Sequence, residues 1–189
     1  MVDFSAARLN MVESQVRTND VTDVRVQDAM RAVPRETLVL PGKAYLAYAD
    51  SDPEYAPGRR LLSPRDVAKL LQALAPQPGQ KALAIAAPYA AAVLEHIGLT
   101  VERLEEGDLK TLPGKDYDLI ICEGAVARAP DAWTAGLVHE GRLGVIERDG
   151  PVGKAVIYIR TETGLARRQV FDATPHFLTG FEPEQGFAF

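Results

Sequence analysis

The sequence has little of what covalent or metal-stabilised proteins use: one cysteine and three histidines in 189 residues. A lone cysteine cannot close an internal disulfide, and the apolar neighbours of Cys122 predict an inert buried thiol rather than a nucleophile. The histidines, His96, His139 and His176, lie far apart and lack the spacing of metal ligands. We therefore expect neither a disulfide scaffold nor a metal site.

Long apolar runs and excess positive charge are also missing. No stretch reaches the roughly 18 apolar residues that a membrane-spanning helix needs. Residues 1–15 carry early charges and no apolar core, which predicts no secretory signal and, by default, a cytoplasmic protein. The net charge of −5 speaks against a general binder of nucleic-acid backbones.

The composition is that of an ordinary globular protein, with 47% hydrophobic and 25% charged residues. A chain of this length can bury about 70% of its unfolded surface, so it needs no staple. There is no internal repeat, low-complexity tract or linker. We expect a single domain over residues 1–189.

Helical patterns dominate the first part of the chain. Apolar positions within Ser5–Arg17 recur at a tolerable helical spacing. Thr22 or Asp23 can cap a second helix, which a proline ends near residue 34. Residues 40–60 are rich in Pro, Gly, Asp and Tyr, and predict an irregular loop with a short helix at Lys43–Tyr48.

From Ser63 onward, helices and short apolar strands alternate. Ser63 followed by Pro64 is typical of a helix N-cap and first helical position, and the helix would run to Leu74. The expected strands are Lys81–Ala87, Thr100–Leu104, Tyr117–Cys122, Gly141–Glu147, Lys154–Arg160 and Leu165–Phe171, with helices at Tyr89–Ile97 and Ala129–Val138. This order predicts an α/β fold: a doubly wound parallel sheet with an antiparallel edge, preceded by helices.

Three stretches carry a resemblance to a known family. Residues 11–38 read MVESQVRTNDVTDVRVQDAMRAVPRETL, and residues 48–71 contain YAD and GRRLLSP. Beyond residue 81 follow YDLIICEGAVARAPDAW and EGRLGVIERDG. Together they resemble the protein-L-isoaspartate O-methyltransferases over nearly the whole chain. The first stretch is the most specific, because other methyltransferases lack it.

The resemblance implies a fold and an activity. The fold is a Rossmann-like class I methyltransferase sandwich with a shortened central sheet and antiparallel C-terminal edge strands. Residues 1–60 would form N-terminal helices and a substrate-type loop, and residues 61–189 the core. The family binds S-adenosylmethionine and methylates the free carboxylate of isoaspartyl residues in damaged proteins. Ser63 stands where the family has a serine near cofactor and substrate, although the residues by themselves favour a plain helix N-cap.

The chain departs from the family at the cofactor loop. The family reads VL[ED]IGxGxGY, in which glycines let the backbone approach the cofactor, whereas this chain reads ALAIAAPYAAAVL. No glycine remains between residues 81 and 97, and the loop is about two residues short. Proline at the helix start supplies no N–H. The vestigial cofactor positions are Ala84 (in place of the acid), Ala86, Ala87, Pro88, Tyr89 and, further on, Glu105.

A second departure is a missing strand–helix unit between residues 104 and 117. If Thr100–Leu104 is the family's second strand, Glu105 matches the acid that binds the cofactor ribose. If it is the third strand, that acid is gone. The residues by themselves favour a simpler interpretation, in which Glu105 and Glu106 form an exposed acidic loop end.

Both departures affect cofactor binding. We therefore expect S-adenosylmethionine binding to be lost or strongly weakened, with no cofactor and a non-catalytic role as a binding or regulatory protein. A protein or peptide partner or a homodimer would fit, while nucleic acid and membrane partners would not. The alternative is an active S-adenosylmethionine-dependent methyltransferase that repairs isoaspartyl residues. Pro88 and Tyr89 should leave no room for the methionine moiety, and an open ligand-sized pocket there would count against this expectation.

Overall fold

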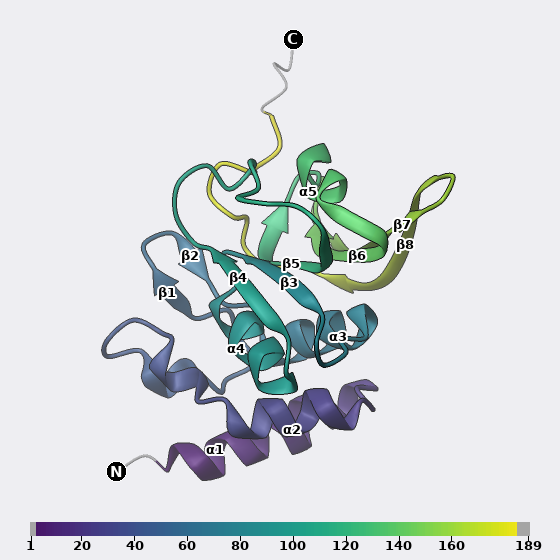
Figure 1. The fold of residues 1–189 in the computed structure, drawn as a ribbon. Helices are drawn as coiled ribbons and strands as arrows, with labels where there is room; N and C mark the ends of the chain where they lie inside the picture. Colours follow the sequence, from purple (N-terminus) through teal and green to yellow (C-terminus); the bar gives the residue numbers. More distant parts are fainter. Residues whose placement is uncertain (1–2, 185–189) are drawn as a thin grey trace.

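A mixed six-stranded sheet forms the centre of the computed structural model, which describes residues 3–184 (Figure 1). The strand order is β4-β3-β5-β6-β7-β8. The first four strands are parallel to one another, β7 is antiparallel to β6, and β8 is antiparallel to β7. The strands are β3 Lys81–Ile85, β4 Thr100–Leu104, β5 Tyr117–Val126, β6 Leu137–Glu147, β7 Gly153–Thr161 and β8 Gly164–Ala173. The expected parallel sheet with an antiparallel edge, preceded by helices, is confirmed.

The N-terminal helices are more broken than the sequence pattern predicts. Helix α1, Phe4–Met11, continues as a π-helical turn at Val12–Val16 and a 3-10 turn at Arg17–Asn19 instead of one regular helix. Helix α2, Val24–Ala32, begins as expected, because the Asp23 carboxylate accepts two backbone N–H groups of its first turn. Further 3-10 turns follow at Arg35–Thr37 and Ala44–Leu46.

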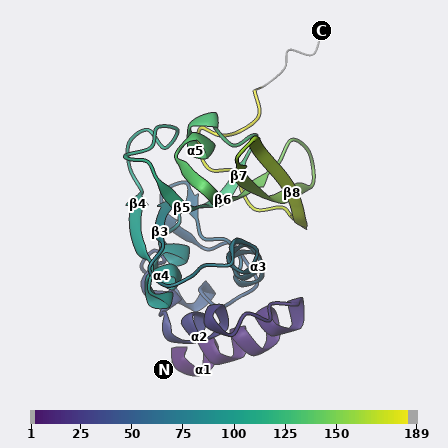
Figure 2. The ribbon, with the colours of Figure 1, turned by 45° about the vertical axis from the view of Figure 1, so that its right-hand side comes forward.

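Helices cover the sheet unequally. Helices α3, Pro64–Leu74, and α4, Pro88–Ile97, pack on one face, and α1 and α2 form an additional layer beneath them (Figures 1 and 2). The other face carries the short helix α5, Asp131–Ala135, the loop 105–116 and the C-terminal segment. Each face of the sheet has its own hydrophobic core. Because successive strand residues point to opposite faces, Ala82 and Ala84 belong to the core under α3 and α4, and Leu83 and Ile85 belong to the core on the other face.

Two expectations about single elements are wrong. Residues 129–138 are not one helix: α5 ends at Ala135, and β6 already begins at Leu137. The loop 40–60 is not wholly irregular, because β1, Glu54–Ala56, pairs with β2, Arg59–Arg60. Gly58 has a φ of 71° in the tight turn between them, which short-range apolar periodicity does not reveal.

The C-terminal segment completes the carboxyl edge of the sheet. Strand β5 extends beyond the point where β3 ends, and the free edge pairs with the segment around Phe177. The Ala125 N–H donates to the His176 carbonyl at 2.9 Å, and the Leu178 N–H donates to the Ala125 carbonyl at 2.8 Å. The expected extended packing of the tail therefore holds as far as the described residues reach; Phe187 and Phe189 lie outside them.

The role of Asp23 as the N-cap of α2 can be tested by mutation. Replacing Asp23 with alanine removes the acceptor for two orphan N–H groups and should lower the free energy of unfolding by about 1 kcal/mol. Chemical denaturation measures the loss. Asp28→Ala on the same helix is the matched control: its exposed ion pair with Arg31 should be worth less than about 0.5 kcal/mol. Equal losses in both variants would contradict the capping role.

Candidate functional site

The connection from β3 to α4 is short and filled by its own side chains. Only Ala86 and Ala87 lie between Ile85, where β3 ends, and Pro88, where α4 begins. Both alanines are fully buried, and Ala86 adopts a φ of 46°, which a residue with a Cβ occupies only with strain. The turn thus keeps a left-handed backbone geometry without a glycine. Its methyl groups occupy the space next to the backbone.

Glu123, on β5, faces this turn with a buried carboxylate. Its Oε1 accepts the Ala90 N–H at 2.8 Å, and its Oε2 accepts the Leu62 N–H at 2.9 Å. The side chain is 1% exposed. Ala90 belongs to the first turn of α4, whose N–H groups have no acceptor within the helix and carry partial positive charge. The Glu123 carboxyl group therefore accepts an N–H at the N-terminus of α4 that has no acceptor within the helix.

Arg35 is the buried cation of the same cluster. Its Nε donates to the Ala47 carbonyl at 2.7 Å, and its Nη2 donates to the Leu62 carbonyl. The guanidinium lies 4.6 Å from the centre of the Tyr89 ring, a cation–π contact. Arg35 Nη1 and the Tyr89 hydroxyl are both buried without a hydrogen-bond partner. Burial lowers the pKa of Arg35, but an arginine remains protonated in proteins.

Burial shifts the pKa of Glu123 in the opposite direction to that of Arg35. It raises the pKa of the carboxyl to about 7, against the lowering influence of Arg35 and of the two backbone N–H groups. Glu123 was not among the residues that the sequence pattern singled out. The available signal was a lone acid between the buried Cys122 and Val126 of an apolar strand, a place where a charge requires partners.

Glu105 follows β4, which pairs directly with β3 and so occupies the place of the second strand. Its Oε2 accepts the Tyr55 hydroxyl at 3.0 Å and lies 3.7 Å from Nη1 of Arg59. Its Oε1 is buried without a partner, and burial raises the pKa of this carboxyl. The interpretation as an exposed loop end is wrong for Glu105, because this side chain is partly buried and hydrogen-bonded; Glu106 is exposed as expected.

A cavity of about 390 Å³, large enough for a small ligand, lies beside Glu105 and Pro88, the residue that follows the alanine turn. This open space counts against the expectation that Pro88 leaves no room for a ligand. Its lining residues are Tyr55, Ala56, Pro57, Arg59, Pro88, Glu105 and Glu106. Of the vestigial cofactor positions it reaches only Pro88 and Glu105; Ala84, Ala86, Ala87 and Tyr89 do not line it. The expected cofactor positions therefore fall into two groups: Pro88 and Glu105 border the cavity, and the other four are buried away from it.

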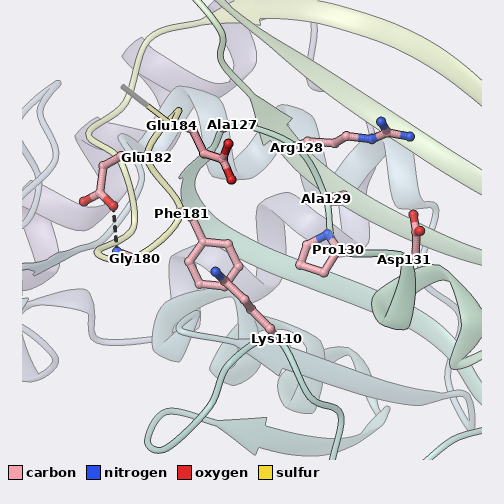
Figure 3. A pocket seen from close by; sticks show the side chains of 10 residues that line it. All are labelled: Lys110, Ala127, Arg128, Ala129, Pro130, Asp131, Gly180, Phe181, Glu182 and Glu184. Carbon is pink, nitrogen blue, oxygen red and sulfur yellow. Dashed lines mark hydrogen bonds between the residues drawn. The ribbon is translucent and has the colours of Figure 1, made fainter. Parts of the chain in front are cut away.

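A larger cavity, of about 460 Å³, lies on the other face of the sheet (Figure 3). It is bounded by the loop 105–116, by the connection between β5 and α5, and by the C-terminal segment. Lys110 lies across the ring of Phe181, with its Nζ 5.2 Å from the ring centre, and Arg128 and Asp131 stand opposite (Figure 3). No residue of α4 lines it, so it is separate from the alanine turn.

Ser63 caps α3. Its hydroxyl accepts the Asp66 N–H at 3.3 Å, and the residue is largely buried. It follows Leu62 directly, which places it one residue from the peptide that Glu123 binds. The capping role is confirmed, while a catalytic role for Ser63 stays a prediction.

Other classes of site find little support within residues 3–184. There is no group of three or more His, Cys, Asp and Glu side chains that could hold a metal ion. None of the helices in this range has the length and apolarity to cross a membrane. Cys122 is fully buried, and burial raises the pKa of its thiol, as expected for an inert core cysteine.

Two solved structures share this arrangement of sheet, helices and N-terminal extension. A Plasmodium falciparum protein described as a putative protein-L-isoaspartate O-methyltransferase in complex with S-adenosyl-L-homocysteine matches with a TM-score of 0.74 and 14% identity, over 91% of this chain and 98% of its own. A second protein-L-isoaspartate O-methyltransferase matches with a TM-score of 0.72 and 17% identity, over 92% of this chain and 66% of its own. The fold is that of a Rossmann-like methyltransferase.

Sequence comparison gives the family. No protein-family model matches the chain. The protein-L-isoaspartate O-methyltransferase of Methylorubrum extorquens (strain PA1) is 32% identical over 92% of this chain and 87% of its own length. The enzyme of that name from Koribacter versatilis is 27% identical over 91% and 90%. The chain belongs to the protein-L-isoaspartate O-methyltransferase family.

The raised pKa of Glu123 predicts how stability depends on pH. A carboxyl whose pKa is about 7 when folded and near 4.5 when unfolded stabilises the fold fully below pH 4.5 and loses that contribution as pH rises to about 7. The loss is roughly 3 kcal/mol at about 1.4 kcal/mol per pH unit. Glu123→Gln removes this titration and leaves all others in place.

Chemical denaturation of both proteins between pH 4.5 and pH 8 tests this expectation. The free energy of unfolding of the natural protein should fall relative to that of Glu123→Gln across this range. A difference that stays constant with pH would show that the carboxyl titrates at its ordinary value.

Proposed function

We propose that this family member has lost or strongly weakened binding of S-adenosylmethionine and works as a non-catalytic protein that binds a protein or peptide. The observation that carries the proposal is the two-residue, fully buried connection between β3 and α4. A cofactor needs free backbone N–H groups and room for close approach at such a turn. Here two methyl groups stand in that space, and the ring of Pro88 borders the cavity beside Glu105.

The residues do not fit the amino-acid end of the cofactor. Pro88 has no N–H to offer at the start of α4. The N–H of Ala90 already donates to Glu123, so a ligand carboxylate would displace a buried one and meet its negative charge. We therefore derive no methyl-transfer step at this site.

The cavity around Phe181 supports a binding role. It combines the aromatic ring of Phe181 with the guanidinium of Arg128, two residue types that are enriched at protein interfaces, next to Lys110 and acidic groups. A partner here would touch the loop 105–116 and the C-terminal segment together (Figure 3). A second copy of the chain is the other partner consistent with this surface, and the net charge of −5 disfavours nucleic acid.

Calorimetric titration of the folded protein with S-adenosylmethionine and S-adenosylhomocysteine tests the proposal. We expect no heat of binding at ligand concentrations up to about 1 mM, which bounds the binding free energy at about −4 kcal/mol. An active family enzyme titrated in parallel verifies the ligands. Micromolar affinity of this chain for either compound would overturn the proposal.

The second candidate function is active repair of isoaspartyl residues, favoured by Glu105. This acid follows the strand next to β3, about 20 residues after the turn, which is the usual place for a ribose-binding carboxylate, and it borders a cavity. Methylation of an isoaspartyl peptide would show this function directly. If turnover is seen, Glu105→Gln should raise the apparent KM for the cofactor, whereas Glu106→Gln should not.

A further inference from the structure

We infer that Glu123 is an internal ligand: its carboxyl group fills an anion site formed by the first turn of α4 and the backbone N–H of Leu62, beside the buried Arg35. The inference deepens the proposed function, and it rests on that proposal for the claim that no external anion uses this helix terminus. It adds the chemical class that the site accepts, a small carboxylate.

Both oxygens of the carboxylate are used as a bound anion's would be. One accepts the Ala90 N–H at 2.8 Å and the other accepts the Leu62 N–H at 2.9 Å. These donors come from α4 and from the end of the loop that precedes α3, segments 28 residues apart in the chain. An ordinary capping side chain serves the N–H groups of its own helix, whereas Glu123 reaches both from β5.

Arg35 supplies the independent sign that the site is built for an anion. Its guanidinium has no solvent exposure, and Nη1 has no hydrogen-bond partner. The same guanidinium donates to the Leu62 carbonyl, so the Leu62 residue is held at its N–H by Glu123 and at its carbonyl by Arg35. A buried cation needs acidic groups in its surroundings, and among the carboxylates Glu123 acts on the charge of Arg35 most strongly, followed by Asp52.

This arrangement fixes the loop without any bound molecule. Leu62 ends the segment that begins at the 3-10 turn of Arg35, and Glu123 ties it to α4. In a ligand-dependent site the same donors would become ordered when an external carboxylate binds. In this chain the acceptor is covalently part of β5, so the closed arrangement needs no bound molecule.

Chemical rescue tests the assignment. Glu123→Ala at pH 8 opens a space lined by two unpaired N–H donors beside Arg35, and formate can enter it. Thermal unfolding is followed in sodium formate and in sodium chloride of equal ionic strength. At ten times its Kd, formate should lower the unfolding equilibrium constant of the variant about tenfold relative to chloride. The natural protein and Glu123→Gln, whose side chain fills the space, should respond equally to both salts.

A second variant keeps the test decisive if the alanine protein does not fold in chloride. Glu123→Ser retains a hydroxyl that can accept one of the two N–H groups and is measured in parallel. Refolding of either variant that depends on formate supports the inference. If formate has no more effect than chloride on both variants, or stabilises Glu123→Gln equally, the inference is wrong.

The two proposals fail separately. Rescue by formate is measured without S-adenosylmethionine, so cofactor binding by the natural protein would overturn the proposed function and leave the rescue result unchanged. Absence of rescue with no cofactor binding would keep the non-catalytic role and remove Glu123 as the occupant of an anion site.

Discussion

A carboxylate without solvent contact has to find its stabilisation within the protein, and Glu123 meets this requirement at the centre of the molecule. It accepts one N–H from α4 and one from Leu62, and the charge of Arg35 opposes part of the rise in its pKa that burial causes. Sheet, cofactor-side helix and substrate-type loop therefore meet at one side chain. A shift of any of these elements would break a hydrogen bond to the buried Glu123, so this side chain helps to fix their relative positions.

The same cluster explains how a member of this family can keep its fold with so altered a cofactor loop. Glycines in such a loop leave donors free for a ligand, and an empty site of this kind exposes polar backbone. Here Ala86 and Ala87 fill the space with methyl groups, and Glu123 accepts the Ala90 N–H in the first turn of α4. The alanine methyl groups and the Glu123 carboxyl group therefore pack and hydrogen-bond around the same turn.

Most of the fold could be predicted because it depends on local patterns. Ser63 and Pro64 mark the start of α3, and the apolar runs mark β3 to β8 with small errors at their ends. The hairpin at Glu54–Arg60 was missed because its pairing depends on a Gly58 turn and on contacts distant in sequence. The order of strands, which places β4 next to β3 and Glu105 beside the turn, follows from pairing that no single segment encodes.

The candidate site was only half predictable for a similar reason. The changed residues of the cofactor loop are visible because the family pattern gives a reference for each position. Glu123 and Arg35 have no local signature, and their roles appear only when Leu62, Ala90 and Tyr89 are placed around them. The burial of Glu123 could have been suspected from its position within an apolar strand, but the residues around it, 33 to 88 positions away in sequence, could not.

The pairing of β5 with the C-terminal segment also bears on the order in which the chain folds. Ala125 bonds to residues about fifty positions later, and the Thr179 hydroxyl donates to the Gly58 carbonyl across 121 positions. Contacts of such long sequence separation close late, because the loop between the partners must be ordered first. During synthesis, the carboxyl edge of the sheet stays incomplete until nearly the whole chain has emerged from the ribosome, and until then the free edge of β5 is accessible to chaperones and to other nascent chains.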